Sequence, residues 1–142
     1  MNNKEILVFI PAYNEEKNLK KVLDDLISHS YSILVIDDGS TDETYNIVSK
    51  LPVSVIRHSN NKGYEKALSS GLDYAIEHDY IYALSFDADG QMFVEDIEKF
   101  FTLAKERDAD IVIGKRKTKN RIFEYFVGGL TRFYYSISDP LY

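Results

Sequence analysis

The sequence predicts an α/β fold in which helices cover both faces of a mostly parallel sheet. Five short apolar runs rich in branched residues alternate with amphipathic segments along the chain. Continuous apolar runs of this kind are typical of strands buried on both faces, and parallel strands need helical crossovers between them. With 142 residues, 44% of them hydrophobic and 28% charged, the chain has the size and composition of one globular domain.

Each element follows from a local pattern. The first strand is expected over residues 5–10, where Pro11 ends the run, and Asn14 is the expected cap of the following helix. Asp42 is expected to cap the second helix, which ends before Pro52. Periodicity predicts helices over 15–29, 43–51, 64–78 and 94–107, and further strands over 32–37, 53–58, 80–86 and 109–114. The residues expected to face the core are Leu19, Val22, Leu23, Leu26 and Ile27 in the first helix and Ala67, Leu68, Leu72, Ala75 and Ile76 in the third.

Composition and charge argue against several classes of protein. The net charge of -6 argues against a nucleic-acid binder, because nothing basic would follow a phosphate backbone. The chain has no cysteine, which excludes disulfides and thiolate sites and is typical of a reducing cytoplasm. The apolar run before Pro11 is too short for a signal-peptide core, and no stretch approaches the ~20 apolar residues of a membrane span. We therefore expect no transmembrane segment.

A polar cluster follows every predicted strand. In chain order the clusters are PAYNEE, DDGSTD, SNNKG, DADGQ and GKRK. The carboxyl ends of parallel strands meet at one edge of the sheet, where ligands of open α/β sheets bind. Acidic turns placed at random would not all fall at this edge, so the clusters predict a ligand site there.

The cluster DADGQ has the pattern of a cation site. Asp87, Asp89 and Gln91 alternate along the chain, so in an extended segment their three side chains point the same way. Oxygen donors that converge on one point repel each other unless a cation lies between them, and Mg²⁺ and Mn²⁺ prefer such ligands. The turn after the first strand has no glycine-rich phosphate loop, so a bound phosphate would depend on the metal.

Other interpretations of the acidic residues stay open at this stage. One is a solvated acidic turn. An EF-hand loop would use Asp87, Asp89 and Gln91, but it needs a glycine where this chain has Met92. A response-regulator receiver has its acidic pair after the first strand, whereas the pair at 37–38 follows the second.

The clusters and their flanks resemble glycosyltransferase family 2. The segments IPAYNEEKNL, VIDDGSTDET, NKGYEKALSSGLDYA, FDADGQ and IVIGKR occur in that family's order and spacing and span essentially the whole chain. DADGQ and the final SDPL are most similar to the polyprenyl-phosphate branch, the relatives of dolichyl-phosphate mannose synthase. The resemblance implies the GT-A fold and an inverting sugar transfer from a UDP- or GDP-linked donor, with Mg²⁺ or Mn²⁺ as cofactor. It also implies a polyprenyl-phosphate acceptor and peripheral contact with the inner face of the membrane.

The resemblance also implies roles for individual residues. Substrate binding falls on Pro11, Tyr13, Glu15, Ile36, Asp38, Asp87, Ala88, Asp89, Gln91 and Arg116. The metal falls on Asp87, Asp89 and Gln91, and Asp89 has the catalytic role. Asp38 would accept a hydrogen bond from a ring N–H of the base, and we expect it at the ligand edge rather than in the core. Arg116 would approach the diphosphate, whereas His29, His58 and His78 fit no site.

The sequence ends, at ISDPLY, where the family usually continues into the acceptor half of its site. We therefore expect residues 1–142 to form a single donor-binding domain, with an aromatic segment over 115–142 and no assigned catalytic base. The alternative is a truncated, non-catalytic domain that binds nucleotide sugars or a protein partner. The apolar side chains at helical spacing in 121–142 predict a homodimer through that segment.

Overall fold

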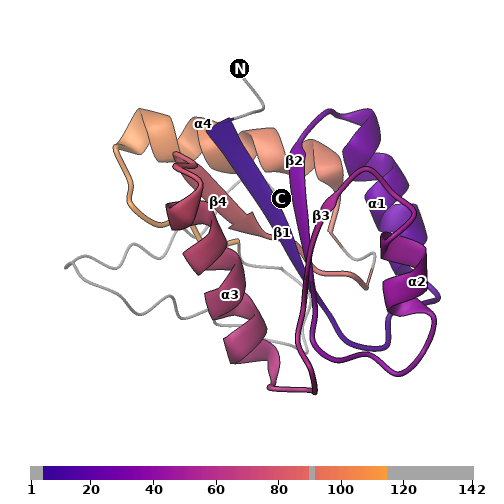
Figure 1. The fold of residues 1–142 in the computed structure, drawn as a ribbon. Helices are drawn as coiled ribbons and strands as arrows, with labels where there is room; N and C mark the ends of the chain where they lie inside the picture. Colours follow the sequence, from indigo (N-terminus) through magenta and orange to yellow (C-terminus); the bar gives the residue numbers. More distant parts are fainter. Residues whose placement is uncertain (1–4, 90–91, 115–142) are drawn as a thin grey trace, which may run out of the picture. The chain divides into compact units, whose positions relative to one another are not determined.

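The computed structural model describes residues 5–89 and 92–114 (Figure 1). The chain divides into two compact units, residues 1–94 and 95–142. The prediction that residues 1–142 form a single domain stays a prediction. The predicted aromatic segment over 115–142 and the proposed dimer surface over 121–142 lie outside the described residues.

The first unit contains a four-stranded, fully parallel sheet. Its strands are β1 (Ile6–Ala12), β2 (Ser32–Asp37), β3 (Ser54–Arg57) and β4 (Tyr82–Ser85), in the spatial order β3-β2-β1-β4. The register pairs Val8 with Ile33 of β2 and with Leu84 of β4, and Ile36 with Ile56 of β3. The parallel sheet that the apolar runs predicted is therefore confirmed.

Three helices of the first unit connect these strands: α1 (Leu19–Ser28), α2 (Thr44–Val48) and α3 (Tyr64–Glu77). A short 3₁₀ turn, η2 (Val94–Asp96), precedes α4 (Ile97–Arg107), which belongs to the second unit. The helices predicted over 15–29, 43–51, 64–78 and 94–107 all exist, with ends that differ by up to four residues. Among the described residues, no helix has the length and apolar character needed to cross a membrane.

Both faces of the sheet are covered. Neighbouring side chains of a strand point to opposite faces, and the side chains of Ile6 to Ile10 are all buried. Leu7 and Phe9 belong to one core cluster with Ala67 and Ala75 of α3. In Figure 1, α3 lies on the β4 side of the sheet. The inward faces of α1 and α3 were predicted largely correctly. Leu68 and Leu72 are partly buried against the core, and the predicted inward residues that are buried are Leu19, Val22, Leu23, Leu26, Ala67 and Ala75.

Pro11 does not end the first strand, as the sequence suggested, because β1 continues through it to Ala12. The carbonyl of Phe9 accepts from the N–H of Phe86, so the backbone of Phe9 faces the β4 side. Pro11, two residues later, faces the same side, where the ladder has already ended at the Phe9–Ser85 pair. The missing N–H of proline therefore removes no ladder hydrogen bond.

The predicted strand over 109–114 is wrong, since the structure assigns no strand to these residues. Ile111 and Ile113 are 44% and 37% exposed. The segment has strand-like composition, but a strand also needs a neighbouring backbone to pair with, and the sheet formed by the described residues has four strands only.

Two further predictions about the helices are corrected. Asn14 does not cap α1, which begins later with Asn18 at the N-cap position, and the Asn14 side chain bonds to Thr41 instead. Ile76 is 74% exposed rather than inward. The buried stripe of α3 runs through Ala67, Gly71 and Ala75, and one further residue turns the side chain by about 100° away from that stripe.

Candidate functional site

The strand order makes the carboxyl ends of β1 and β4 the expected place of a ligand. The chain moves from β1 to β2 and β3 on one side, and then crosses to β4 on the other side of β1. Open α/β sheets bind ligands where the strand order reverses in this way. The two predicted clusters PAYNEE and DADGQ follow these two strands.

The segment after β1 is fixed against the segment after β2 by hydrogen bonds in both directions. The N–H of Asn14 donates to Ser40 Oγ (3.0 Å), and the N–H of Thr41 donates to Asn14 Oδ1 (2.9 Å). The N–H of Glu15 donates to Thr44 Oγ1 at 2.8 Å, and Thr44 is fully buried. These bonds hold the PAYNEE turn in place at the ligand edge.

Pro11, Tyr13 and Glu15 lie at or just after the end of β1, and their predicted contacts with a nucleotide stay a prediction. The Tyr13 side chain is 45% exposed and available for contact. The pKa of Glu15 is raised above its ordinary value, first because burial disfavours the charged form and then because the Asp89 carboxylate repels it. Two carboxylates that come from the ends of β1 and β4 thus lie within electrostatic reach of each other, an arrangement that a cation would stabilise.

The segment after β4 provides the other predicted residues. Asp87 is half-buried, Ala88 is buried and Asp89 is exposed. Gln91 and Arg116 lie outside the described residues. In the described part of the chain, no three acidic or histidine side chains form a metal-binding group. The donor set itself suits a hard cation, since two carboxylates and one amide oxygen are oxygen ligands and Glu15 adds negative charge nearby.

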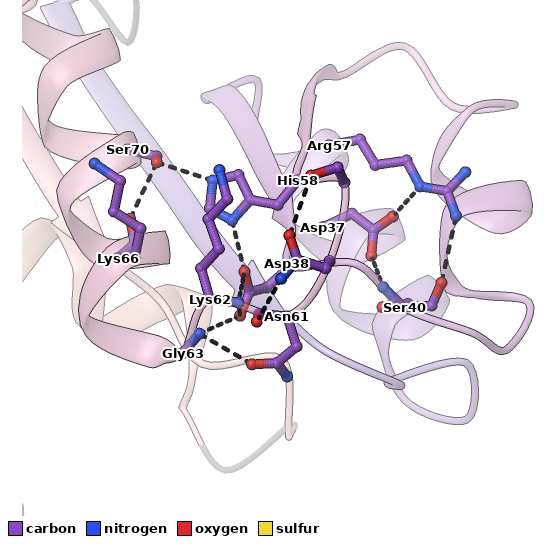
Figure 2. Close-up of polar contacts among 12 residues, drawn as sticks. Asp37, Asp38, Ser40, Arg57, His58, Asn61, Lys62, Gly63, Lys66 and Ser70 are labelled. Carbon is purple, nitrogen blue, oxygen red and sulfur yellow. Dashed lines mark hydrogen bonds and ion pairs between the residues drawn. The ribbon is translucent and has the colours of Figure 1, made fainter.

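Asp38 departs from the expectation that it lies outside the core, because it is only 3% exposed. Its carboxylate accepts hydrogen bonds from His58 Nδ1 (2.5 Å) and from the backbone N–H groups of Lys62 (3.0 Å) and Gly63 (2.8 Å), as Figure 2 shows. Burial alone would raise the pKa of Asp38, but these three hydrogen bonds outweigh burial and hold the pKa below its ordinary value. Ile36 is fully buried, so both residues predicted to meet the base are largely enclosed by protein.

His58 is the site residue that sequence reasoning missed. It is 6% exposed, and its second ring nitrogen, Nε2, lies 3.0 Å from Ser70 Oγ of α3. The signal lies in the structure and not in the sequence: the register pairs Asp37 with Arg57, so Asp38 and His58 are the first residues after two adjacent strands. Titratable side chains in matching positions after adjacent parallel strands are expected to meet.

The neighbouring acidic residue, Asp37, has a structural role. It is fully buried, and its Oδ2 lies 3.0 Å from Arg57 Nε. Its Oδ1 accepts from the N–H of Ser40 (2.9 Å), and the Arg57 guanidinium lies 4.1 Å from the centre of the Tyr45 ring. The two adjacent carboxylates therefore have different roles: Asp37 fixes the turn after β2, and Asp38 holds the loop after β3.

Comparison with known families agrees with this arrangement. Residues 7–136 match the model described as "Glycosyl transferase family 2". The chain belongs to glycosyl transferase family 2. The family membership and the parallel sheet confirm the predicted family and its GT-A type of α/β fold.

Three curated relatives indicate the branch of the family. The chain is 37% identical to a "UDP-N-acetylglucosamine--dolichyl-phosphate N-acetylglucosaminyltransferase" of Methanococcus voltae, with 82% of this chain and 53% of the relative covered. It is 31% identical to a "Polyprenol monophosphomannose synthase" of Mycolicibacterium smegmatis (89% and 47% covered) and 35% identical to a "Dolichol-phosphate mannosyltransferase" of Pyrococcus furiosus (81% and 34% covered). The chain thus spans about half the length, or less, of these relatives.

Proposed function

We propose that this chain forms the donor-binding part of a glycosyltransferase that transfers a sugar from a nucleotide diphosphate sugar to a polyprenyl phosphate. The observation that carries the proposal is the family membership, together with relatives named for dolichyl-phosphate and polyprenol acceptors. The geometry supports it, because the PAYNEE and DADGQ segments follow the two strands that flank the reversal of strand order. We place the activity in the cytoplasm, at the inner face of the membrane that holds a lipid acceptor.

In this proposal, the residues after β1 and β2 hold the nucleoside. Tyr13, Pro11 and Glu15 line the base and ribose, and Asp38 receives a ring N–H of the base. Three protein donors already bond to the Asp38 carboxylate, because the N–H of Lys62 reaches both oxygens (3.0 and 3.1 Å), His58 Nδ1 reaches one and the N–H of Gly63 the other. A ring N–H of the base would therefore share an oxygen with the Lys62 N–H or take its place. An imide-like N–H, such as that of uracil or guanine, provides such a donor.

The diphosphate lies at the end of β4. Asp87 and Ala88 meet the ribose and phosphates, Arg116 approaches the diphosphate, and Asp87, Asp89 and Gln91 would hold a Mg²⁺ or Mn²⁺ ion. When bound, this ion neutralises the charge that develops on the departing nucleoside diphosphate. Asp89 has its catalytic role in this arrangement.

The transfer itself is a displacement at the anomeric carbon of the sugar. An oxygen of the acceptor phosphate forms a bond to this carbon, and the bond between the carbon and the nucleoside diphosphate breaks, with the electron pair leaving on the diphosphate. Attack from the face opposite the leaving group inverts the anomeric configuration. The phosphate oxygen is already anionic near neutral pH, so it needs no residue to remove a proton.

The metal and the nucleotide are expected to bind cooperatively, because residues 11–16, at the end of β1, contain no glycine-rich phosphate loop. Titration of UDP and GDP by calorimetry, with Mn²⁺ and with EDTA, should show at least severalfold tighter binding with the metal. Asp89→Ala should abolish this coupling, and Asp87→Ala should also weaken nucleotide binding. Asp24→Ala is the matched control, since it removes an exposed carboxylate on α1. Equal affinity in Mn²⁺ and EDTA contradicts the proposed metal site.

A transfer assay tests the acceptor. The chain, a panel of UDP- and GDP-linked sugars and Mn²⁺ are combined with polyprenyl phosphate in liposomes, and a thermal-shift panel first identifies the donor that stabilises the folded state. Formation of the lipid-linked sugar supports the proposal. If the donor binds but no sugar is transferred to polyprenyl phosphate and no free sugar is released, the chain is a binding domain instead.

A further inference from the structure

The loop after β3, residues 59–63, is held against the end of β2 by the Asp38 carboxylate. Asp38 bonds to the N–H groups of Lys62 and Gly63, the two residues that directly precede α3. The loop backbone also lies so close to Gly39 that a Cβ there would stand 2.4 Å from the carbonyl carbon of Asn60. The position of Asp38 and the position of this loop are therefore fixed by each other.

His58 connects this carboxylate to α3. The ionised carboxylate of Asp38 accepts hydrogen bonds only, so the Nδ1 atom of His58 must donate. The Nε2 atom lies 3.0 Å from Ser70 Oγ, and the same hydroxyl lies 3.0 Å from the carbonyl oxygen of Lys66 one turn earlier (Figure 2). With both nitrogens engaged in a nearly buried ring, His58 has one orientation, and it transmits that orientation to Asp38.

We infer that His58 is a positioning residue of the nucleotide site, which orients the Asp38 carboxylate and the loop 59–63 through its bonds to Asp38 and Ser70. The inference rests on the proposed function, in which Asp38 receives a ring N–H of the base. In this inference His58 acts through Asp38 and not through a contact of its own with the nucleotide. It fixes the orientation of the Asp38 carboxylate before the nucleotide arrives, so its loss lowers affinity for the base without removing a ligand contact.

Two substitutions at His58 separate its two bonds. Asn places a donor near the position of Nδ1 and keeps the bond to Asp38, whereas Gln places a donor near Nε2 and keeps only the bond to Ser70. His58→Gln should weaken UDP or GDP binding in Mn²⁺ by about tenfold, as expected for a lost hydrogen bond to a charged group. His58→Asn should stay within about threefold of the wild type. His78→Gln is the matched control, because His78 is an exposed histidine at the opposite end of α3.

A second readout needs no nucleotide. Amide hydrogen exchange of Lys62 and Gly63, measured by NMR, reports whether Asp38 still holds the loop. Faster exchange in His58→Gln with near-normal exchange in His58→Asn supports the inference. If His58→Gln does not fold, Ser70→Ala takes its place, since it removes the other anchor of the ring from a half-buried helix position. It should increase exchange at both amides and weaken binding.

The outcomes distinguish this inference from the proposed function. Wild-type affinity and wild-type amide exchange in both His58→Gln and Ser70→Ala overturn the inference while the proposed function stands. Equal losses of affinity in the Asn and Gln variants, with the loop amides unchanged, also overturn it, because the ring would then act in some other way than through Asp38. If the wild type binds neither UDP nor GDP, the proposed function fails and the positioning role at the nucleotide site fails with it.

Discussion

Gly71→Ala should destabilise the protein, although helix propensity alone predicts the opposite. Gly71 lies inside α3, where replacing glycine with alanine normally stabilises a helix by about 1 kcal/mol. In this structure, a Cβ at residue 71 would stand 2.2 Å from Phe9 Cδ2 and 2.7 Å from two further atoms of the same ring. The sign of the change in stability therefore decides between local propensity and tertiary packing.

The magnitude follows from how little Phe9 can move. Ordinary contact begins at 3.4 Å, so the ring or the helix backbone must shift by about 1.2 Å. Phe9 is 1% exposed and belongs to the core cluster between the sheet and α3, so a shift disturbs several neighbours. Overpacking of this kind costs roughly 1–3 kcal/mol, and we expect the upper part of that range. After the gain in helix propensity, the net loss should be about 1–2 kcal/mol.

Urea unfolding at equilibrium, followed by circular dichroism, measures this loss. Phe9→Leu provides the second arm of a double-mutant cycle, because a smaller side chain leaves room for the new methyl group. The double variant should be more stable than the sum of the two single changes predicts, by about 1–2 kcal/mol. A Gly71→Ala variant at least as stable as the wild type, or a double variant that is additive within about 0.5 kcal/mol, refutes the packing argument.

Three other predictions concern the polar residues that hold the ligand edge. Thr44→Val should lower the free energy of unfolding by about 1–3 kcal/mol, because the N–H of Glu15 loses its acceptor. Thr44→Ser keeps that acceptor and should cost less, so equal losses of the two variants in urea unfolding contradict the role of the hydroxyl. Arg57→Ala should lower the free energy of unfolding by roughly 1–3 kcal/mol, which is below the range for fully buried pairs because the arginine side chain is 46% exposed. Lys20→Ala, at an exposed ion pair, should change it by less than about 0.5 kcal/mol, and similar small effects in both variants rule out a strong buried pair. The pKa of Asp38 is lower in the folded state than its ordinary value of 3.8, so its ionised form contributes stability that is complete above that value and is lost as the pH falls through the folded pKa. Asp38→Asn should therefore flatten the acid side of the stability curve, and an unchanged slope speaks against this contribution.

The position of the site depends mainly on features that the sequence contains locally. Apolar runs such as 32–37 are typical of strands covered on both faces, and the polar clusters that follow parallel strands meet at one edge of the sheet. For this reason the four strands of the sheet and the approach of Glu15 to Asp89 near the ends of β1 and β4 could be predicted. The family could be predicted because the order and spacing of the polar clusters resemble its motifs. The periodicity of 3.6 residues likewise identified the inward face of α1.

Other features depend on what each segment meets in the folded chain, and no local pattern contains that information. Pro11 is accepted within β1 because the ladder with β4 has already ended, and residues 109–114 form no strand despite suitable composition. Gly71 must be a glycine because Phe9, 62 positions earlier in the chain, occupies the space of its Cβ. His58 is part of the site only because the register of β2 and β3 brings it beside Asp38. The two residues are 20 positions apart in the sequence, so their contact depends on how the strands pair and not on the residues next to either of them.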